Sequence, residues 1–264
     1  MINRIQFIEI EDQIWCPKAI RDGTTDYLQF VLIKTKPYQA IVELLNAALE
    51  KCGTDRVIDL CSGAGGPWPI LQSAMETARE RTLCVRLTDL YPNDSTWKWM
   101  ENHLPDRISY EAKPVDAAHV PAHLTGFRTL FSGFHHFPPD KATQILRDAV
   151  GQRQGIAIFE LTERTLPAVL GMILVPLIIL LVTPAIRPVR FSRLLFTYLL
   201  PAIPLIGFVD GIISCLRTYS PDEMRRMVNP FNEYDWAIGQ IPVRGLSAPI
   251  TYTIGTPKIS SNKF

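Results

Sequence analysis

The fold is decided by the stretch Arg56-Val57-Ile58-Asp59-Leu60-Cys61-Ser62-Gly63-Ala64-Gly65-Gly66. A short apolar run is typical of a buried strand, and the glycines that follow it predict a turn before a new helix that begins at Pro67. Such a turn lets the backbone approach a ligand closely, and it points the amide groups of a helix N-terminus at that ligand. The stretch therefore predicts a strand, a ligand-binding turn and a helix.

Predicted strands and helices alternate along the rest of the chain. We expect further strands over 83–88, 108–112, 130–134 and 156–161, and helices over 93–103 and 140–151. Ser220 is a good N-cap for a later helix because Pro221 follows it and Glu223 stands three residues on. Two final strands are expected over 234–243 and 249–255. This alternation predicts a parallel α/β sheet covered by helices on both faces.

Two classes of ligand use a glycine turn of this kind. A dinucleotide site reads G-x-G-x-x-G, which requires a third glycine at the position of Trp68 and so disfavours a nicotinamide enzyme. The spacing Asp59-x-Cys61-x-Gly63-x-Gly65 instead resembles the acid-x-G-x-G-x-G motif of class I (Rossmann-like) S-adenosylmethionine-dependent methyltransferases. Cys61 replaces the first glycine of that motif as a small residue.

The resemblance implies a seven-stranded, mostly parallel sheet in the order 3-2-1-4-5-7-6 with an antiparallel last strand. It implies S-adenosyl-L-methionine as the cofactor, with Asp59 supporting the turn and the methionine amino group, Asp89 on the ribose and Asp116 near the adenine amino group. The implied cofactor-binding residues are Asp59, Cys61, Gly63, Gly65, Asp89, Leu90, Asp116, Ala117, Ser132 and Gly133. The expected reaction is in-line methyl transfer to an O, N or C nucleophile.

His135 and His136 follow the fourth strand, where the resemblance places the acceptor. A histidine near neutral pKa can take a proton from a hydroxyl or an amine, so both are candidate catalytic residues. Adjacent residues in extended chain point in opposite directions, and we therefore expect at most one of them to face the acceptor. The alternative is that a histidine packs the following helix. Glu160 either orients a substrate or forms a salt bridge, for example with Arg164.

Composition excludes several other classes of protein. Of the 264 residues, 47% are hydrophobic and 20% charged, which excludes a disordered chain. Lys plus Arg is 27 and Asp plus Glu is 26, so the net charge of +1 gives no basis for binding nucleic acid. The five cysteines are scattered without zinc-finger spacing, and we expect no disulfide framework and no metal. Reduced thiols and the lack of a signal peptide at the N-terminus favour the cytoplasm.

We expect two parts, an N-terminal helical cap over 1–55 and a methyltransferase domain over 56–264. Trp15, Tyr27 and Phe30 in the cap either form a lid over the cofactor or pack the N-terminal helix onto the sheet. The domain carries an apolar insertion over 165–216, which interrupts the alternation after the fifth strand.

The insertion contains two runs without charge, 22 residues over 165–186 and 16 over 194–209, separated by Arg187, Arg190 and Arg193. Three arrangements remain open: a hairpin in one membrane leaflet with the arginines at lipid phosphates, a soluble lid around an apolar pocket, or a two-pass transmembrane hairpin. Five prolines in the runs oppose straight spanning helices. We favour docking of 165–209 on the inner face of a membrane. The expected enzyme methylates an apolar or lipid-like small molecule, and the alternative is a non-methylating protein that binds S-adenosylmethionine or a lipid on the same fold.

Overall fold

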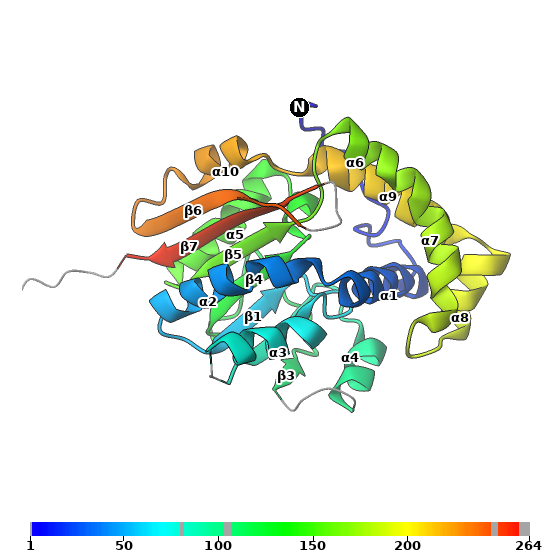
Figure 1. Cartoon of the computed structure of the whole chain (residues 1–264), viewed down its shortest axis with the longest axis horizontal. Coiled ribbons are helices and arrows are strands. Elements are labelled where there is room, and N and C mark those ends of the chain that lie inside the picture. The colour runs from blue at the N-terminus through cyan, green and yellow to red at the C-terminus, as the bar shows by residue number, and fades with distance from the viewer. Residues whose placement is uncertain (1, 80–81, 103–106, 244–247, 259–264) are drawn as a thin grey trace, which may run out of the picture.

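The computed structural model describes residues 2–79, 82–102, 107–243 and 248–258, and a single twisted sheet forms its centre (Figure 1). Seven strands lie in the order β3-β2-β1-β4-β5-β7-β6, as predicted. Strands β1 to β5 pair in parallel, whereas β7 is antiparallel to both β5 and β6. The strands are β1 Arg56–Leu60, β2 Cys84–Leu87, β3 Ile108–Tyr110, β4 Phe127–Phe131, β5 Ile156–Glu160, β6 Tyr234–Ile241 and β7 Ile250–Pro257.

The predicted strand over 130–134 is displaced, because β4 begins at Phe127 and ends before Phe134, which lies in a 3-10 turn. The sequence hid this start because Arg128 interrupts the apolar run. Arg128 is nevertheless fully buried, and its guanidinium pairs with Asp148 at 2.6 Å. Pairing of this kind is what permits a charge to lie inside a sheet. The other predicted strands are within three residues of the observed ends where the structure describes them.

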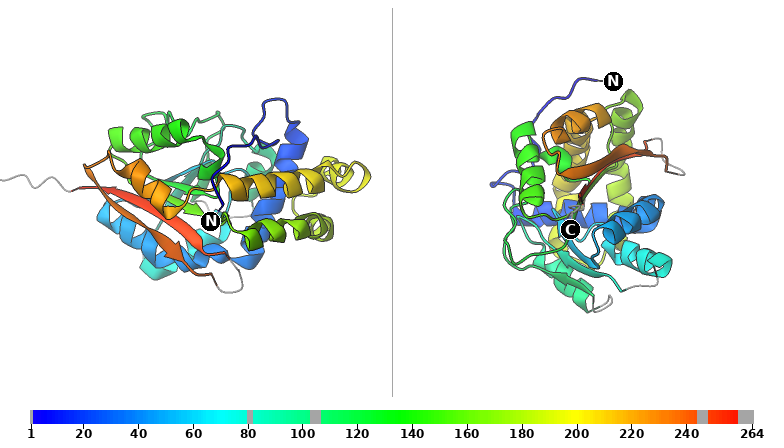
Figure 2. Two further views of the ribbon diagram at one scale, coloured as in Figure 1. Left: turned by 90° about the horizontal axis from the view of Figure 1, so that it is seen from above. Right: turned by 90° about the vertical axis from the view of Figure 1, so that its left-hand side faces the viewer.

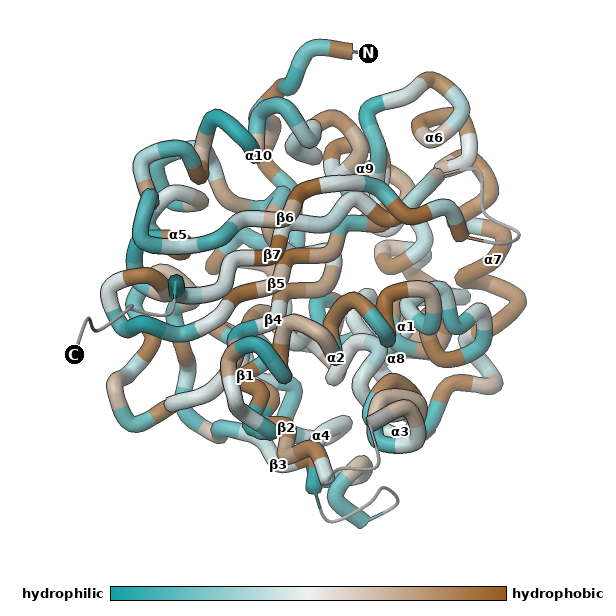
Figure 3. The backbone as a smooth tube through the Cα atoms, turned by 60° about the vertical axis from the view of Figure 1, so that its left-hand side comes forward, coloured by the Kyte–Doolittle hydropathy of each residue, from teal (hydrophilic) through white to brown (hydrophobic). Residues whose placement is uncertain are grey.

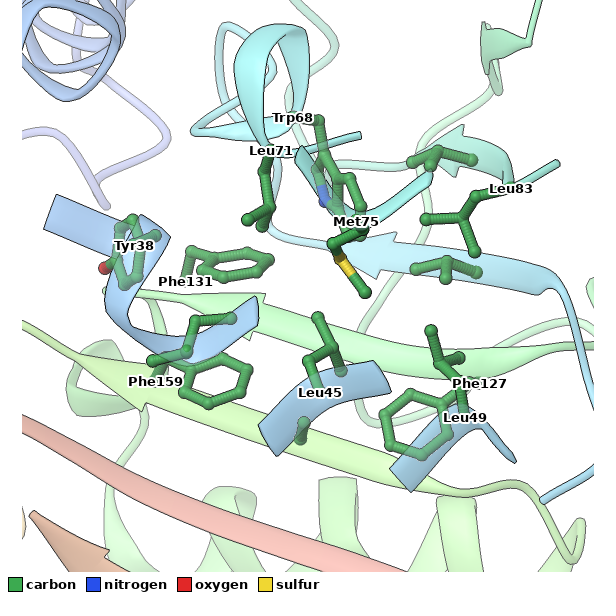
Figure 4. Close-up of a cluster of buried hydrophobic side chains, with 14 of the residues drawn as sticks. Tyr38, Leu45, Leu49, Trp68, Leu71, Met75, Leu83, Phe127, Phe131 and Phe159 are labelled. Carbon is green, nitrogen blue, oxygen red and sulfur yellow. The ribbon is translucent and has the colours of Figure 1, made fainter. Parts of the chain in front are cut away.

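Helices cover both faces of the sheet, as the right-hand view of Figure 2 shows. On one face, α2 (Val42–Lys51) and α3 (Trp68–Arg79) bury Leu45, Trp68 and Met75 against the phenylalanines of β4 and β5 (Figure 4). On the other face, α5 (Pro139–Gly151) and α10 (Pro221–Val228) form a second apolar cluster. The predicted capping box is present at the start of α10. Beyond β2, α4 spans Asp94–Glu101; position 103, the predicted end of that helix, lies outside the described residues.

The N-terminal region has two parts. Residues 2–17 form turns and extended chain, and α1 (Lys18–Thr35), a 3-10 turn over Pro37–Ile41 and α2 follow. Of the three aromatic residues that were expected to cover the cofactor or pack on the sheet, Tyr27 and Phe30 instead pack against the apolar insertion, and Trp15 is exposed. The boundary at residue 55 stays a prediction.

The insertion forms an arm beside α1, at the end of the sheet where the parallel strands finish (Figures 1 and 2). Its first half is α6 (Leu166–Gly171), a 3-10 turn, α7 (Val175–Val182) and a second 3-10 turn. Its second half is α8 (Phe191–Leu194), a π-helical turn over Leu195–Leu199 and α9 (Ala202–Arg217). The span Leu166–Ala185 is long and apolar enough to cross a membrane, with a mean hydropathy of 2.7 and 11% of it buried. Helix α7 is accordingly among the most hydrophobic stretches in Figure 3.

A small residue fixes the position of the arm on α1. A Cβ atom at Gly23, in the second turn of α1, would lie 2.4 Å from Ile203 Cδ1 of α9. Ile179 of α7 and Ile206 of α9 are buried in the same cluster as Tyr27. One face of the arm is therefore packed on the domain, while its outer face is left apolar and exposed.

Candidate functional site

Asp59 braces the glycine turn from below. Its carboxylate accepts hydrogen bonds from Ser62 Oγ at 2.7 Å and from Thr129 Oγ1 at 2.6 Å, and the side chain is fully buried at the end of β1. Burial raises the pKa of Asp59 to about 6, although both hydroxyl donors oppose that shift. The acid thus supports the turn, as the resemblance implied; a contact with a methionine amino group stays a prediction.

The turn itself uses left-handed backbone that favours glycine. Gly63 and Gly65 have φ of 52° and 102°, and Cys61 adopts φ of 56° at the place where the motif has its first glycine. A Cβ atom at Gly133 would lie 3.2 Å from the Cβ of Cys61, so the turn packs closely on the loop after β4. Burial raises the pKa of the Cys61 thiol well above its usual range, which argues against a role as nucleophile.

Asp89 joins the turn to the end of β2. Its Oδ2 accepts the amide hydrogen of Gly63 at 2.7 Å, and its Oδ1 accepts that of Tyr91 at 2.8 Å. The backbone of Val115 in turn donates to the Asp89 carbonyl oxygen, which brings the loop after β3 to the same place. Leu90 beside it is exposed. The structure therefore brings the predicted ribose acid to the edge of the glycine turn.

The remaining predicted cofactor residues lie on the two neighbouring loops. Asp116 is half-exposed, accepts the amide hydrogen of Ala118 at 2.9 Å and contacts His119 Nδ1 at 3.1 Å, while Ala117 is buried. Ser132 Oγ lies 2.8 Å from the hydroxyl of Tyr38. Asp59 lies near the end of β1, and the other nine predicted residues lie on the loops at the carboxyl ends of β1 to β4, where open α/β sheets bind ligands.

Helix α1 packs directly on the glycine turn. The side-chain amide of Gln29 donates to the carbonyl oxygen of Ala64, and a Cβ atom at Gly65 would lie 3.1 Å from the same nitrogen. Thr25 of α1 would lie 3.2 Å from a Cβ atom at Gly63. The N-terminal helix thus packs against the turn so closely that a side chain at Gly63 or Gly65 would crowd Thr25 or Gln29.

The prediction that His135 and His136 point in opposite directions is wrong. Both lie in a 3-10 turn over Phe134–His136 rather than in extended chain, and their ring centroids are 4.4 Å apart. His135 Nδ1 lies 2.6 Å from Glu160 Oε2, and the other oxygen of Glu160 accepts the amide hydrogen of Phe134 at 2.8 Å. Glu160 therefore holds His135 and the turn that carries it.

Three charged residues that the sequence analysis missed complete this cluster. His136 Nδ1 lies 2.8 Å from Glu9 Oε2 and 2.7 Å from Asp12 Oδ1, both in the N-terminal segment. Arg217 at the end of α9 donates to Asp12 at 3.0 Å and to the carbonyl oxygen of His135 at 3.1 Å. The sequence did contain one signal for this cluster. Asp210 and Arg217 are the two charged residues of an otherwise uncharged helix, and isolated charges in an apolar helix indicate buried partners.

The charged residues of this cluster shift one another's pKa values. Burial alone would lower the pKa of His136, but the carboxylates of Glu9 and Asp12 raise that pKa well above its usual range. Burial alone would raise the pKa of Asp12, but His136 and Arg217 hold it at about 2. The 3-10 turn that carries both histidines directly follows Gly133, where a Cβ atom would lie 3.2 Å from Cys61 Cβ, so the cluster adjoins the glycine turn. Perturbed groups gathered beside a ligand-binding loop are typical of functional sites.

The expectation that the three arginines of the insertion all contact lipid phosphates is wrong, because two of them form ion pairs within the protein. Arg193 pairs with Asp26 at 2.5 Å, and Arg190 pairs with Asp22 at 3.2 Å, both acids being on α1. Asp22 and Asp26 stand one helical turn apart, so they present two carboxylates on one face. Arg187 donates to the carbonyl oxygen of Pro184 and is exposed.

No family model matches the chain, and no curated protein matches it by sequence. Among solved structures it is similar to LaPhzM, with 16% identity and a TM-score of 0.50 over 86% of this chain and 57% of that one. The strand order agrees with the order expected of the methyltransferase sheet. The chain has the class I methyltransferase fold.

Two further similar structures are a SAM-dependent methyltransferase from Aquifex aeolicus and human N-acetylserotonin methyltransferase in complex with SAM. The first is 13% identical over 85% of this chain and 92% of that one, with a TM-score of 0.46. The second is 12% identical over 90% and 64%, with a TM-score of 0.45. The chain thus spans less than two thirds of LaPhzM and of the human enzyme, and the likeness concerns the fold alone.

Proposed function

We propose that this chain is an S-adenosylmethionine-dependent methyltransferase that acts on an apolar or lipid-like small molecule. The observation that carries the proposal is the meeting of two groups of residues at one end of the sheet. The glycine turn with Asp89 forms one group, and the cluster around His135 and His136, in the turn that follows Gly133, forms the other. Fold alone does not determine function, and these two groups supply the chemistry.

The residues present fit the cofactor. Cβ atoms at Gly63, Gly65 and Gly133 would lie 2.8–3.2 Å from Thr25, Met100 and Cys61, so these glycines let α1, α4 and the loop after β4 pack closely around the turn. Asp89 offers carboxylate oxygens at its edge for two ribose hydroxyls, and half-exposed Asp116 lies on the adenine side. When bound, S-adenosylmethionine supplies an electrophilic methyl group, and the protein holds it near the acceptor.

On the acceptor side we propose that His135 assists loss of a proton from the nucleophile, because the carboxylates that raise the pKa of His136 keep that imidazole protonated. His135 Nε2 is buried without a hydrogen-bond partner among the residues that the structure describes, whereas Nδ1 of the same ring is held by Glu160. His136 Nδ1 lies 2.7 Å from Asp12 Oδ1 of the N-terminal segment. A proton acceptor at this place contributes about 10²–10⁴-fold to a rate.

We also propose that the arm docks in the plane of a membrane on the cytoplasmic face. Large apolar side chains are exposed along it: Leu166, Leu170, Ile173, Leu174, Leu177, Leu181, Phe191, Leu199, Leu200 and Leu205. Soluble surfaces rarely expose contiguous apolar patches of more than about 300–600 Å². Arg190 and Arg193 hold the arm on α1 through their ion pairs with Asp22 and Asp26. Docking in the plane of the membrane leaves these ion pairs intact, whereas a bilayer-spanning arrangement would have to break them.

A hollow of about 550 Å³ supports an apolar acceptor that arrives from the lipid. It lies between the N-terminal segment and α9 and is lined by Gln6, Phe7, Ile8, Val209, Ile212, Ile213 and Leu216. Glu9 and Arg217 of the histidine cluster each directly follow a lining residue in the chain. We propose that an apolar acceptor enters from the exposed apolar surface through this hollow.

Methyltransferase activity is tested by incubating the purified protein with methyl-labelled S-adenosylmethionine and a membrane lipid extract. Transfer of label to an organic-soluble product, with release of S-adenosylhomocysteine, is expected. Binding of the cofactor without any turnover on lipid or metabolite extracts would favour the non-methylating alternative.

Docking is tested separately by flotation with anionic liposomes. The variant with Leu170, Leu177 and Leu181 all changed to Ser should lose flotation, because each exposed leucine contributes about 1.5–3 kcal/mol of transfer free energy when buried. Leu28→Ser, at an exposed leucine on α1, is the matched control and should float like the parent. Parent protein that stays with the unbound fraction would contradict membrane docking.

A further inference from the structure

Glu9, His135 and His136 converge from two distant parts of the chain on one small volume. One nitrogen or oxygen atom of each lies within 4.8 Å of those of the other two. His136 Nδ1 is 2.8 Å from Glu9 Oε2, and His135 Nε2 is 3.9 Å from Glu9 Oε1. A zinc ion with ligand bonds of about 2.0–2.2 Å holds its donor atoms roughly 3–3.6 Å apart, so small adjustments suffice.

The surroundings of His135 match those of a histidine that binds a metal. Such a histidine commonly donates its second ring nitrogen to a carboxylate, which fixes the ring and its tautomer. Glu160 takes this position at 2.6 Å from Nδ1, and it is itself fixed by the amides of Phe134 and His135. Nε2, the nitrogen left free, is buried and has no hydrogen-bond partner in the described part of the chain. An unpaired buried polar atom beside a carboxylate calls for a ligand.

The charge of the cluster also favours a cation. Glu9, Asp12 and Glu160 place three carboxylates around the two imidazoles, and Asp210 adds negative charge close by. Arg217 supplies one positive charge, at 3.4 Å from Glu9 Oε1 and 3.0 Å from Asp12 Oδ2. Metal binding requires both imidazoles to be neutral, and three carboxylates then face one guanidinium, an excess of two negative charges. A divalent ion removes that excess.

We propose that Glu9, His135 and His136 bind a divalent transition-metal ion, with Asp12 beside it and Glu160 orienting His135. Two imidazoles and one carboxylate suit Zn²⁺ or Fe²⁺ and leave coordination positions open. An acceptor hydroxyl at an open position would ionise more readily, so the histidines would assist its deprotonation as ligands. Ion binding goes beyond the proposed function and does not depend on it. The expectation of no metal was based on cysteines and on ligands close together in the sequence.

The test is calorimetric titration of metal-depleted full-length protein with Zn²⁺, without S-adenosylmethionine. We expect one ion per chain with a Kd below about 10 µM. His135→Ala, His136→Ala and Glu9→Gln should each weaken binding by about 100-fold or more, and Glu160→Gln by about 10–100-fold. His123→Ala, at an exposed histidine, is the matched control and should bind like the parent.

The Co²⁺-substituted protein separates this site from the exposed thiol of Cys84. Nitrogen and oxygen donors give visible bands without the intense near-ultraviolet thiolate absorption of a cysteine ligand.

Absence of Zn²⁺ binding to the parent protein at about 100 µM overturns the proposal. So does unchanged binding in His135→Ala and His136→Ala variants whose circular dichroism matches the parent. In either case the cluster is an ion-pair network without a metal ion. Methyl transfer could still be observed, so the two proposals fail independently.

Discussion

Arg193→Met tests how the insertion is fastened to the domain. Arg193 is 2% exposed, and its guanidinium donates to Asp26 Oδ2 and to the carbonyl oxygens of Ile186 and Pro188. Methionine keeps an unbranched apolar side chain but removes the charge and all the donors. The carboxylate of Asp26, 1% exposed, then loses its closest cation.

The magnitude follows from what remains around Asp26. Removing one partner of a buried ion pair costs about 3–5 kcal/mol, because the other charge stays out of water without compensation. Arg190 remains 3.3 Å from Asp26, and Thr96 still donates to it at 2.7 Å. We therefore expect the lower end, a loss of about 3 kcal/mol in the free energy of unfolding.

Urea unfolding followed by circular dichroism measures this loss. With a slope of about 3 kcal/mol/M, the midpoint of Arg193→Met should fall by about 1 M. The control is Arg225→Met, which breaks the exposed pair with Asp222 (side chains 55% and 77% exposed) and should cost about 0–1 kcal/mol. Asp26→Asn combined with Arg193→Met should cost less than the sum of the single changes. A loss in Arg193→Met no larger than that of the control refutes the reasoning.

Three further changes probe the glycine turn. Asp89→Ala should weaken S-adenosylmethionine binding by about 1–3 kcal/mol in calorimetry, and unchanged binding would contradict its place on the ribose. The folded-state pKa of Asp59 is raised to about 6, so the folded protein binds the proton more tightly and stability falls as pH rises from 4 to 6. Asp59→Asn should flatten that part of the stability profile measured by urea unfolding, and a slope equal to that of the parent would count against it. Gly65→Ala places a Cβ atom 2.8 Å from Met100 Cε at φ of 102° and should lower stability by about 1–2 kcal/mol in the same assay, whereas a neutral result would show that the turn relaxes freely.

Local patterns were sufficient for most of the sheet and for the cofactor side of the site. The strand Arg56–Leu60, the glycines after it and the spacing to Asp89 are features of neighbouring residues or of successive strand ends. Parallel strands place their carboxyl ends at one edge, so residues that end successive strands meet there without further information. The capping box at Ser220 could be predicted for the same reason, because its two hydrogen bonds join residues three apart.

Local patterns failed where backbone geometry departs from the regular elements. The two histidines were expected to diverge, but the chain after β4 turns at once into a 3-10 turn, which Glu160 stabilises through its amide contacts. The start of β4 was missed because Arg128, a buried charge, can be recognised only through its partner Asp148. A charged residue in an apolar run is normally interpreted as exposed at the surface, and only knowledge of its counterion shows that it can be buried.

By itself, the sequence determined the class I sheet, the glycine turn with its acids and the presence of an apolar insertion. The tertiary structure decided which charges face one another. Glu9 and Asp12 meet His136, and Asp26 meets Arg193, across separations in the chain that no periodic pattern reports. The physical reason is that an ion pair depends on distance in space and on exclusion of water, and both are set by how α1 and the arm pack together.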